Sequence, residues 1–77
     1  MSLGEAPANV ILKIAEIDSG IEIKRKLTSI GIHNGDLLMK LNTRKSGPVL
    51  LKNLSAGISK LALGRGLADK IFVNYDN

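Results

Sequence analysis

The sequence contains no cysteine and no tryptophan, and its only histidine is His33. The absence of cysteine excludes a disulfide framework, a thiolate nucleophile and a zinc site built on thiolates. A single imidazole also excludes any catalytic or metal site that needs two histidines. Because small extracellular domains usually depend on disulfides, we expect a cytoplasmic protein.

Long apolar runs are also absent, and none approaches the roughly 18 residues that a membrane-spanning helix needs. The N-terminus has no basic region followed by an apolar run, so we expect no signal peptide. The 77 residues are nevertheless 44% hydrophobic, which predicts one folded domain over residues 1–77. The net charge of +4 is compatible with nucleic acid, acidic lipid or an acidic protein as a partner.

The clearest local pattern predicts a helix over residues 19–30. Ser19 and Glu22 fit the S-x-x-E capping box that begins many helices. Apolar residues then recur at positions i, i+4 and i+7: Ile23, Leu27 and Ile30. Gly31 follows where a left-handed residue ends a helix, in a Schellman cap that would bring Ile32 to Leu27.

Five short strands are predicted around this helix. One precedes it, over residues 10–17, which are rich in β-branched side chains. The other four are expected over residues 37–42, 49–54, 58–63 and 71–75, with one helical turn near residues 67–70. Short strands joined by tight turns favour a small closed barrel.

Apolar residues occupy both faces of these strands. If every second residue from Leu37 to Leu41 points into the barrel, Leu38 points outward. Leu50 likewise lies on the opposite face of its strand from Leu51. Because a small barrel cannot enclose both sets, we expect some leucines, with Leu38 and Leu50 as candidates, to form an exposed patch of the kind that marks an interface. This surplus favours a binding module over an enzyme.

Polar motifs offer no catalytic, cofactor or metal site. Glu16, Asp18 and Glu22 flank the predicted helix start, where carboxylates suit the helix dipole. His33 lies in an Asn-Gly turn. Residues 64–66 read G-x-G without a third glycine, and too few residues follow for the helix of a nucleotide-binding unit. We therefore expect a protein without enzymatic activity, cofactor or metal.

Basic residues leave nucleic-acid binding as an alternative. Lys24, Arg25 and Lys26 lie mostly off the apolar stripe of the helix and could join other basic residues in a patch. Small barrels that bind nucleic acid normally add stacking aromatic side chains, and Phe72 and Tyr75 are the only aromatics here.

Three segments, in this order, resemble the ferrous iron transport protein A (FeoA) family. Residues 24–36 resemble its basic helix, which ends in Leu-x-x-(Met/Ile)-Gly-(Ile/Leu) before a glycine-containing turn. Gly47-Pro48-Val49 resembles the Pro-Val that opens its third strand. Residues 61–73 resemble its Leu-Ala-Leu segment, the following Leu-Ala and the closing Ile-x-Val.

The resemblance implies a mainly β protein: a small SH3-like barrel of about five short strands, with one helix between the first and second. It implies a cytoplasmic, non-catalytic accessory protein of bacterial ferrous iron uptake that binds the GTPase region of the FeoB permease. FeoA-like domains also serve as interaction domains of iron- or manganese-dependent repressors, which is a further alternative, and self-association stays open. For the FeoB partner we expect contacts on the helix and the surface beside it, at Lys24, Arg25, Lys26, Leu27, Leu38 and Leu50.

Overall fold

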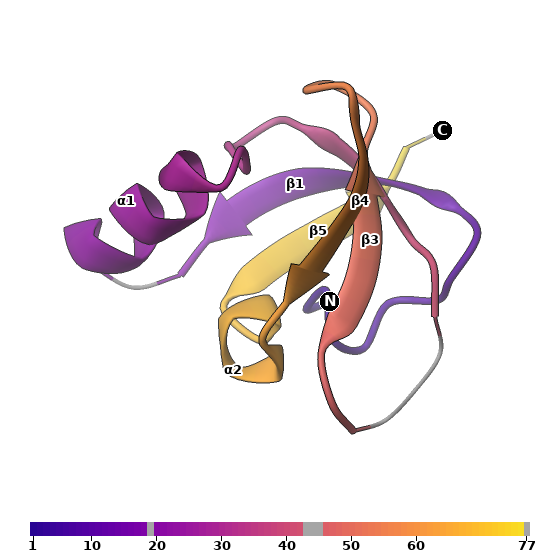
Figure 1. Ribbon diagram of the computed structural model, residues 1–77, viewed down its shortest axis with the longest axis horizontal. Helices are drawn as coiled ribbons and strands as arrows, with labels where there is room; N and C mark the ends of the chain where they lie inside the picture. Colours follow the sequence, from indigo (N-terminus) through magenta and orange to yellow (C-terminus); the bar gives the residue numbers. More distant parts are fainter. Residues whose placement is uncertain (19, 43–45, 77) are drawn as a thin grey trace.

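The elements follow one another as the sequence predicts, in a computed structural model that describes residues 1–18, 20–42 and 46–76 (Figure 1). In chain order they are β1 (Ile11–Ile17), α1 (Ile21–Ser29), β2 (Leu37–Lys40), β3 (Val49–Asn53), β4 (Ile58–Leu63), α2 (Arg65–Ala68) and β5 (Ile71–Tyr75). All five predicted strands and the helix between the first two are present. The single turn α2 begins two residues earlier than predicted.

The strands form one antiparallel sheet in the order β4-β3-β2-β1-β5. The last strand therefore pairs with the first. The N-terminal residues extend the sheet beyond β5, because the Leu3 N–H donates to the Ile71 carbonyl at 2.7 Å and the Val73 N–H donates to the Met1 carbonyl at 2.8 Å. No helix among the described residues is long and apolar enough to cross a membrane.

One hydrophobic core lies on the inner face of this sheet. Alternate residues of each strand point into it, such as Leu12 and Ile14 of β1 and Val49 and Leu51 of β3. Leu27 of α1 and Ala68 of α2 join the same cluster. Since side chains of all five strands meet in one cluster, the sheet must curl around it.

Strand β2 presents the opposite face to the core from the one predicted. Leu38 is fully buried, whereas Leu37 and Met39 are half-buried and Leu41 is exposed. The expectation of an outward Leu38 is therefore wrong. Register explains the reversal, because Leu38 lies opposite the buried Leu12 of β1.

Lys40 shares this inward face, which the alternation of β2 requires. Its side chain is only 3% exposed, and its Nζ donates to the carbonyls of Ala6 at 2.7 Å and Gly4 at 3.1 Å. Burial, and secondarily the charge of Arg65, lowers the pKa of Lys40. Two backbone carbonyls thus make it possible to bury a residue type that is normally exposed.

Helix α1 has the predicted end and a different start. Its N-cap is Gly20, which has no capping side chain, and the predicted capping residue Ser19 lies outside the described residues. At the other end Gly31 has a φ of 92°. The Ile32 N–H donates to the Leu27 carbonyl at 2.9 Å and the Gly31 N–H donates to the Thr28 carbonyl at 3.1 Å, which is the Schellman motif.

Candidate protein-interaction surface

Helix α1 carries the concentration of positive charge that the sequence analysis singled out. Lys24, Arg25 and Lys26 are all exposed. Among the residues that the structure describes, none of the three forms an ion pair, because the one ion pair there joins His33 to Asp36. These cations are therefore available to an acidic partner.

The same helix also exposes an apolar side chain. Ile21 is 64% exposed, and Lys24 and Arg25, three and four residues later, share its face of the helix. Sequence reasoning missed Ile21 because it placed the helix start two residues earlier. We call Ile21, Lys24, Arg25 and Lys26 the α1 surface.

The α1 surface lies off the side of the helix that packs against the core. Leu27 is fully buried, and Ile23 and Ile30 pack against the core cluster. Figure 1 shows the first turn of α1 pointing away from the sheet and its last turn returning toward it. A surface that stands away from the barrel can be reached from several sides.

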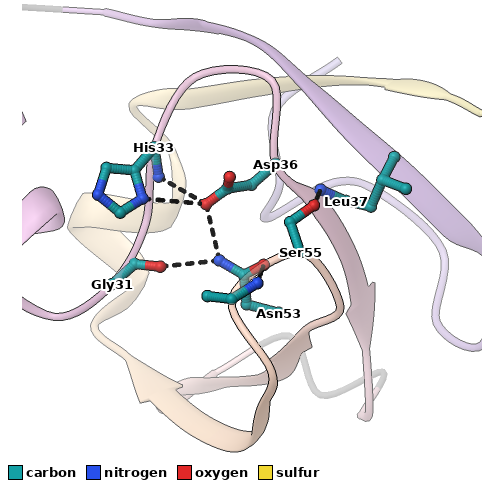
Figure 2. Close-up of polar contacts among 7 residues, drawn as sticks. Gly31, His33, Asp36, Leu37, Asn53 and Ser55 are labelled. Atoms are coloured by element: carbon teal, nitrogen blue, oxygen red, sulfur yellow. Dashed lines mark hydrogen bonds and ion pairs between the residues drawn. The ribbon is translucent and has the colours of Figure 1, made fainter.

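A buried amide holds the end of α1 to the sheet (Figure 2). Asn53, at the end of β3, is fully buried, and its Nδ2 donates to the Gly31 carbonyl and to Asp36 Oδ2, both at 2.8 Å. The Ala56 N–H donates to Asn53 Oδ1 at 3.1 Å. Asp36 Oδ2 also accepts from the His33 N–H at 2.9 Å. One side chain thus joins the helix end, the loop before β2 and the turn after β3.

A second set of contacts fixes the turn after β3 against β2. The Leu37 N–H donates to Ser55 Oγ at 2.9 Å, and the Leu54 N–H donates to the Leu37 carbonyl at 2.8 Å. In Figure 2, Ser55 points toward Leu37, whereas Asn53 points toward Gly31 and Asp36. The segments around the helix end are therefore tied to the sheet at several points, which orients α1.

This polar network has the geometry of a structural anchor. His33 Nδ1 lies 3.3 Å from Asp36 Oδ2, and the His33 side chain is half exposed. No group of three or more His, Cys, Asp or Glu side chains that could hold a metal gathers within the described part of the chain. The acidic side chains singled out near the helix start, Glu16, Asp18 and Glu22, belong to no such group either.

The six residues expected to contact a partner do not form one surface. Lys24, Arg25 and Lys26 lie on α1, whereas Leu27 and Leu38 are fully buried and have no area to offer a partner in this conformation. Leu50 is half-buried in β3, opposite Ala62 of β4. The burial of Leu38 corrects its assignment as an exposed anchor.

Comparison with known proteins finds one matching family and several solved structures of similar fold. The FeoA domain family model matches residues 1–75. The crystal structure of an iron uptake regulatory protein (FeoA) is 26% identical with a TM-score of 0.84, over 96% of this chain and 95% of that one. The solution structure of iron(II) transport protein A from Clostridium thermocellum is 22% identical with a TM-score of 0.83, over 97% of this chain and 45% of that one.

The manganese regulator SloR is similar over 97% of this chain and 34% of its own, at 12% identity and a TM-score of 0.80. At 12% identity to SloR and 22% to the Clostridium thermocellum protein, these two likenesses show a shared fold alone. No curated protein matches this chain.

Proposed function

This chain belongs to the FeoA family of small proteins in ferrous iron transport, and we propose that it is a cytoplasmic, non-catalytic module that binds the GTPase region of the FeoB iron permease. The proposal treats residues 1–77 as one interaction domain. The family match over residues 1–75 is the observation that carries it. The SH3-like barrel that the sequence predicts is confirmed by the same likeness.

The α1 surface supports this proposal physically. Lys24 and Arg25, with no ion pair in the described structure, share the face of the exposed Ile21, and the unpaired Lys26 lies next to Arg25 on a helix whose other face is anchored in the core. Charges at the rim of an interface raise the association rate and select the partner, while an apolar side chain at its centre contributes affinity. We therefore place FeoB on α1, with Lys24, Arg25 and Lys26 facing carboxylates of the GTPase region.

The remaining predicted contact residues have smaller roles in this proposal. Leu27 holds the helix in place from the core and Leu38 holds β2 in place, so both act without touching the partner. Leu50 lies on the sheet and is not a contact of α1.

Binding of the isolated GTPase region to charge-reversed variants tests the proposal. We expect Lys24→Glu/Arg25→Glu to weaken binding about tenfold or more, since each position changes from attraction to repulsion. The matched control, Lys60→Glu/Lys70→Glu, makes the same change in net charge at two exposed sites outside α1. Isothermal titration calorimetry at fixed ionic strength measures both.

Equal weakening by both pairs would mean that only net charge matters, and the assignment to α1 would fail. No binding of the unaltered chain, with or without guanine nucleotide, would contradict the FeoB proposal itself. Binding of a short RNA that falls steeply with salt would instead support the nucleic-acid alternative.

A further inference from the structure

The face of the sheet opposite the core carries a continuous apolar stripe along β2. Leu37 and Met39 are half-buried there, and Leu41 continues the alternation and is 37% exposed. Met39 lies opposite Ile11 of β1, and the Leu41 N–H donates to the Leu50 carbonyl of β3 at 2.7 Å. Apolar side chains of three neighbouring strands thus meet on one face.

One lysine stands on each side of this stripe. Lys13 of β1 lies opposite Leu37, and Lys52 of β3 lies opposite Met39. Neither lysine forms an ion pair among the described residues. Asp76, beyond β5, lies beside Ile11 at the edge of this face, since its N–H donates to the Ile11 carbonyl at 3.2 Å. We name six residues the outer sheet surface: Ile11, Lys13, Leu37, Met39, Leu50 and Lys52.

An open groove adjoins this surface at Lys13. It has a volume of about 590 Å³, and its polar lining includes Lys13, Asn34, Asn74 and the exposed Tyr75. An ammonium group, two amides and a phenol can all donate hydrogen bonds to one carboxylate. The lining of the groove therefore offers hydrogen-bond donors and a positive charge to an acidic side chain that arrives beside the stripe.

These features select one kind of occupant. A helix or a second sheet covers an apolar sheet face in folded proteins, and a helix about 10–12 Å wide spans two to three strands, which is the width of this surface. We propose that the outer sheet surface binds an amphipathic helix of a protein partner, which places its apolar stripe on β2 and carboxylates on Lys13 and Lys52. The proposal depends neither on the α1 surface nor on FeoB.

Two other occupants fit the surface less well. A second copy of this chain would bring two lysine-flanked faces together and so place like charges side by side. Anionic membranes are recognised by clusters of about four to eight basic residues, whereas this surface carries Lys13 and Lys52 alone. An acidic helix satisfies both the apolar stripe and its two flanking charges.

A synthetic helical peptide tests the proposal. It carries leucine at positions i, i+3, i+4 and i+7 with glutamate on both sides of that stripe, and a control peptide carries lysine in place of glutamate. We expect saturable amide shifts at Lys13, Leu37, Met39 and Lys52 of the labelled chain with the acidic peptide alone. Lys13→Glu/Lys52→Glu should weaken this binding about tenfold or more, and Lys24→Glu/Arg25→Glu should leave it within about twofold.

Four outcomes would overturn the proposal. They are no saturable shifts with the acidic peptide, shifts confined to α1, equal weakening by the two double variants, and protection of the outer sheet surface by phosphatidylserine vesicles with no response to the peptide. Lys13, Lys24 and Arg25 are exposed and Lys52 is half-buried, so amide spectra of the free variants check that each keeps the unaltered fold. FeoB is not used in this test, so its result is separate from that of the proposed function.

Discussion

At the scale of single residues, Asn53 and Lys40 are the two polar side chains on which the most structure depends. Both are buried on the inner face of the sheet, and each is satisfied by groups distant in sequence: Asn53 by Gly31 and Asp36, and Lys40 by Gly4 and Ala6. Sequence reasoning found neither, because residue type predicts exposure for both and only the folded backbone supplies the partners.

Replacing the fully buried Asn53 by alanine should destabilise the fold by about 2–4 kcal/mol, since the Gly31 carbonyl and the Ala56 N–H lose their partner and a hydrogen bond to Asp36 is lost. The matched control is Asn34→Ala in the exposed turn, for which we expect a change within about 0.5 kcal/mol. Urea unfolding followed by circular dichroism measures both. Similar losses for the two variants would mean that the network contributes little.

Lys40 should make stability depend on alkaline pH. Its pKa in the folded state is lowered, so between that pKa and the ordinary value of 10.5 the unfolded chain binds more protons than the folded one. Stability contributed by this group therefore rises with pH through that window and is lost as pH falls. In urea unfolding from pH 7 to about 10.5, the unaltered chain should gain free energy of unfolding relative to Lys40→Met. A constant difference between the two chains would contradict the lowered pKa.

At the scale of the elements, local sequence patterns predicted the helix end and the strands, which are determined by residues close together in the sequence. The Schellman end of α1 follows from the Leu27-to-Ile32 spacing, and the five strands follow from short apolar runs between turns. The face that β2 presents to the core did not follow, because apolar residues stand on both of its faces and a shift by one residue exchanges them. Pairing with β1 and β3 decides it, and that pairing is not local.

Alanine should have opposite effects at two glycines: Gly31, which follows α1, and Gly66, which lies within α2. Gly31 has a φ of 92°, and an added Cβ would lie 2.6 Å from Ile58 Cδ1, so Gly31→Ala should destabilise by about 1–2 kcal/mol. Gly66, within α2, has open space around it, so Gly66→Ala should be neutral or stabilising by up to about 1 kcal/mol. Thermal unfolding distinguishes the signs. A tolerated Gly31→Ala would contradict the assigned helix end.

Adjacent residues of β2 should respond very differently to the same charge. Leu38→Glu would place a carboxylate in the fully buried core, which should cost several kcal/mol and abolish cooperative unfolding. Met39→Glu changes a half-buried side chain on the opposite face and should leave a folded chain. Amide spectra with urea titrations test the pair. A folded Leu38→Glu variant with an unfolded Met39→Glu variant would restore the face first predicted from the sequence.

At the scale of the whole molecule, the positive charge that the sequence revealed is divided between different surfaces. Lys24, Arg25 and Lys26 lie on α1, while Lys13 and Lys52 flank the apolar stripe on the sheet. The family and the order of elements could be predicted because their motifs are local and occur in sequence. The composition of each surface could not, because it depends on strand register and on the direction in which α1 leaves the barrel.

The most direct test of the central claim is an amide-shift titration of the labelled chain with the cytoplasmic GTPase region of FeoB, with and without guanine nucleotide, and with a short RNA as control. The account predicts localised shifts on α1, centred on Ile21, Lys24 and Arg25, with the GTPase region and none with RNA. An absence of shifts with the GTPase region, together with broad shifts of basic residues with RNA, would contradict it.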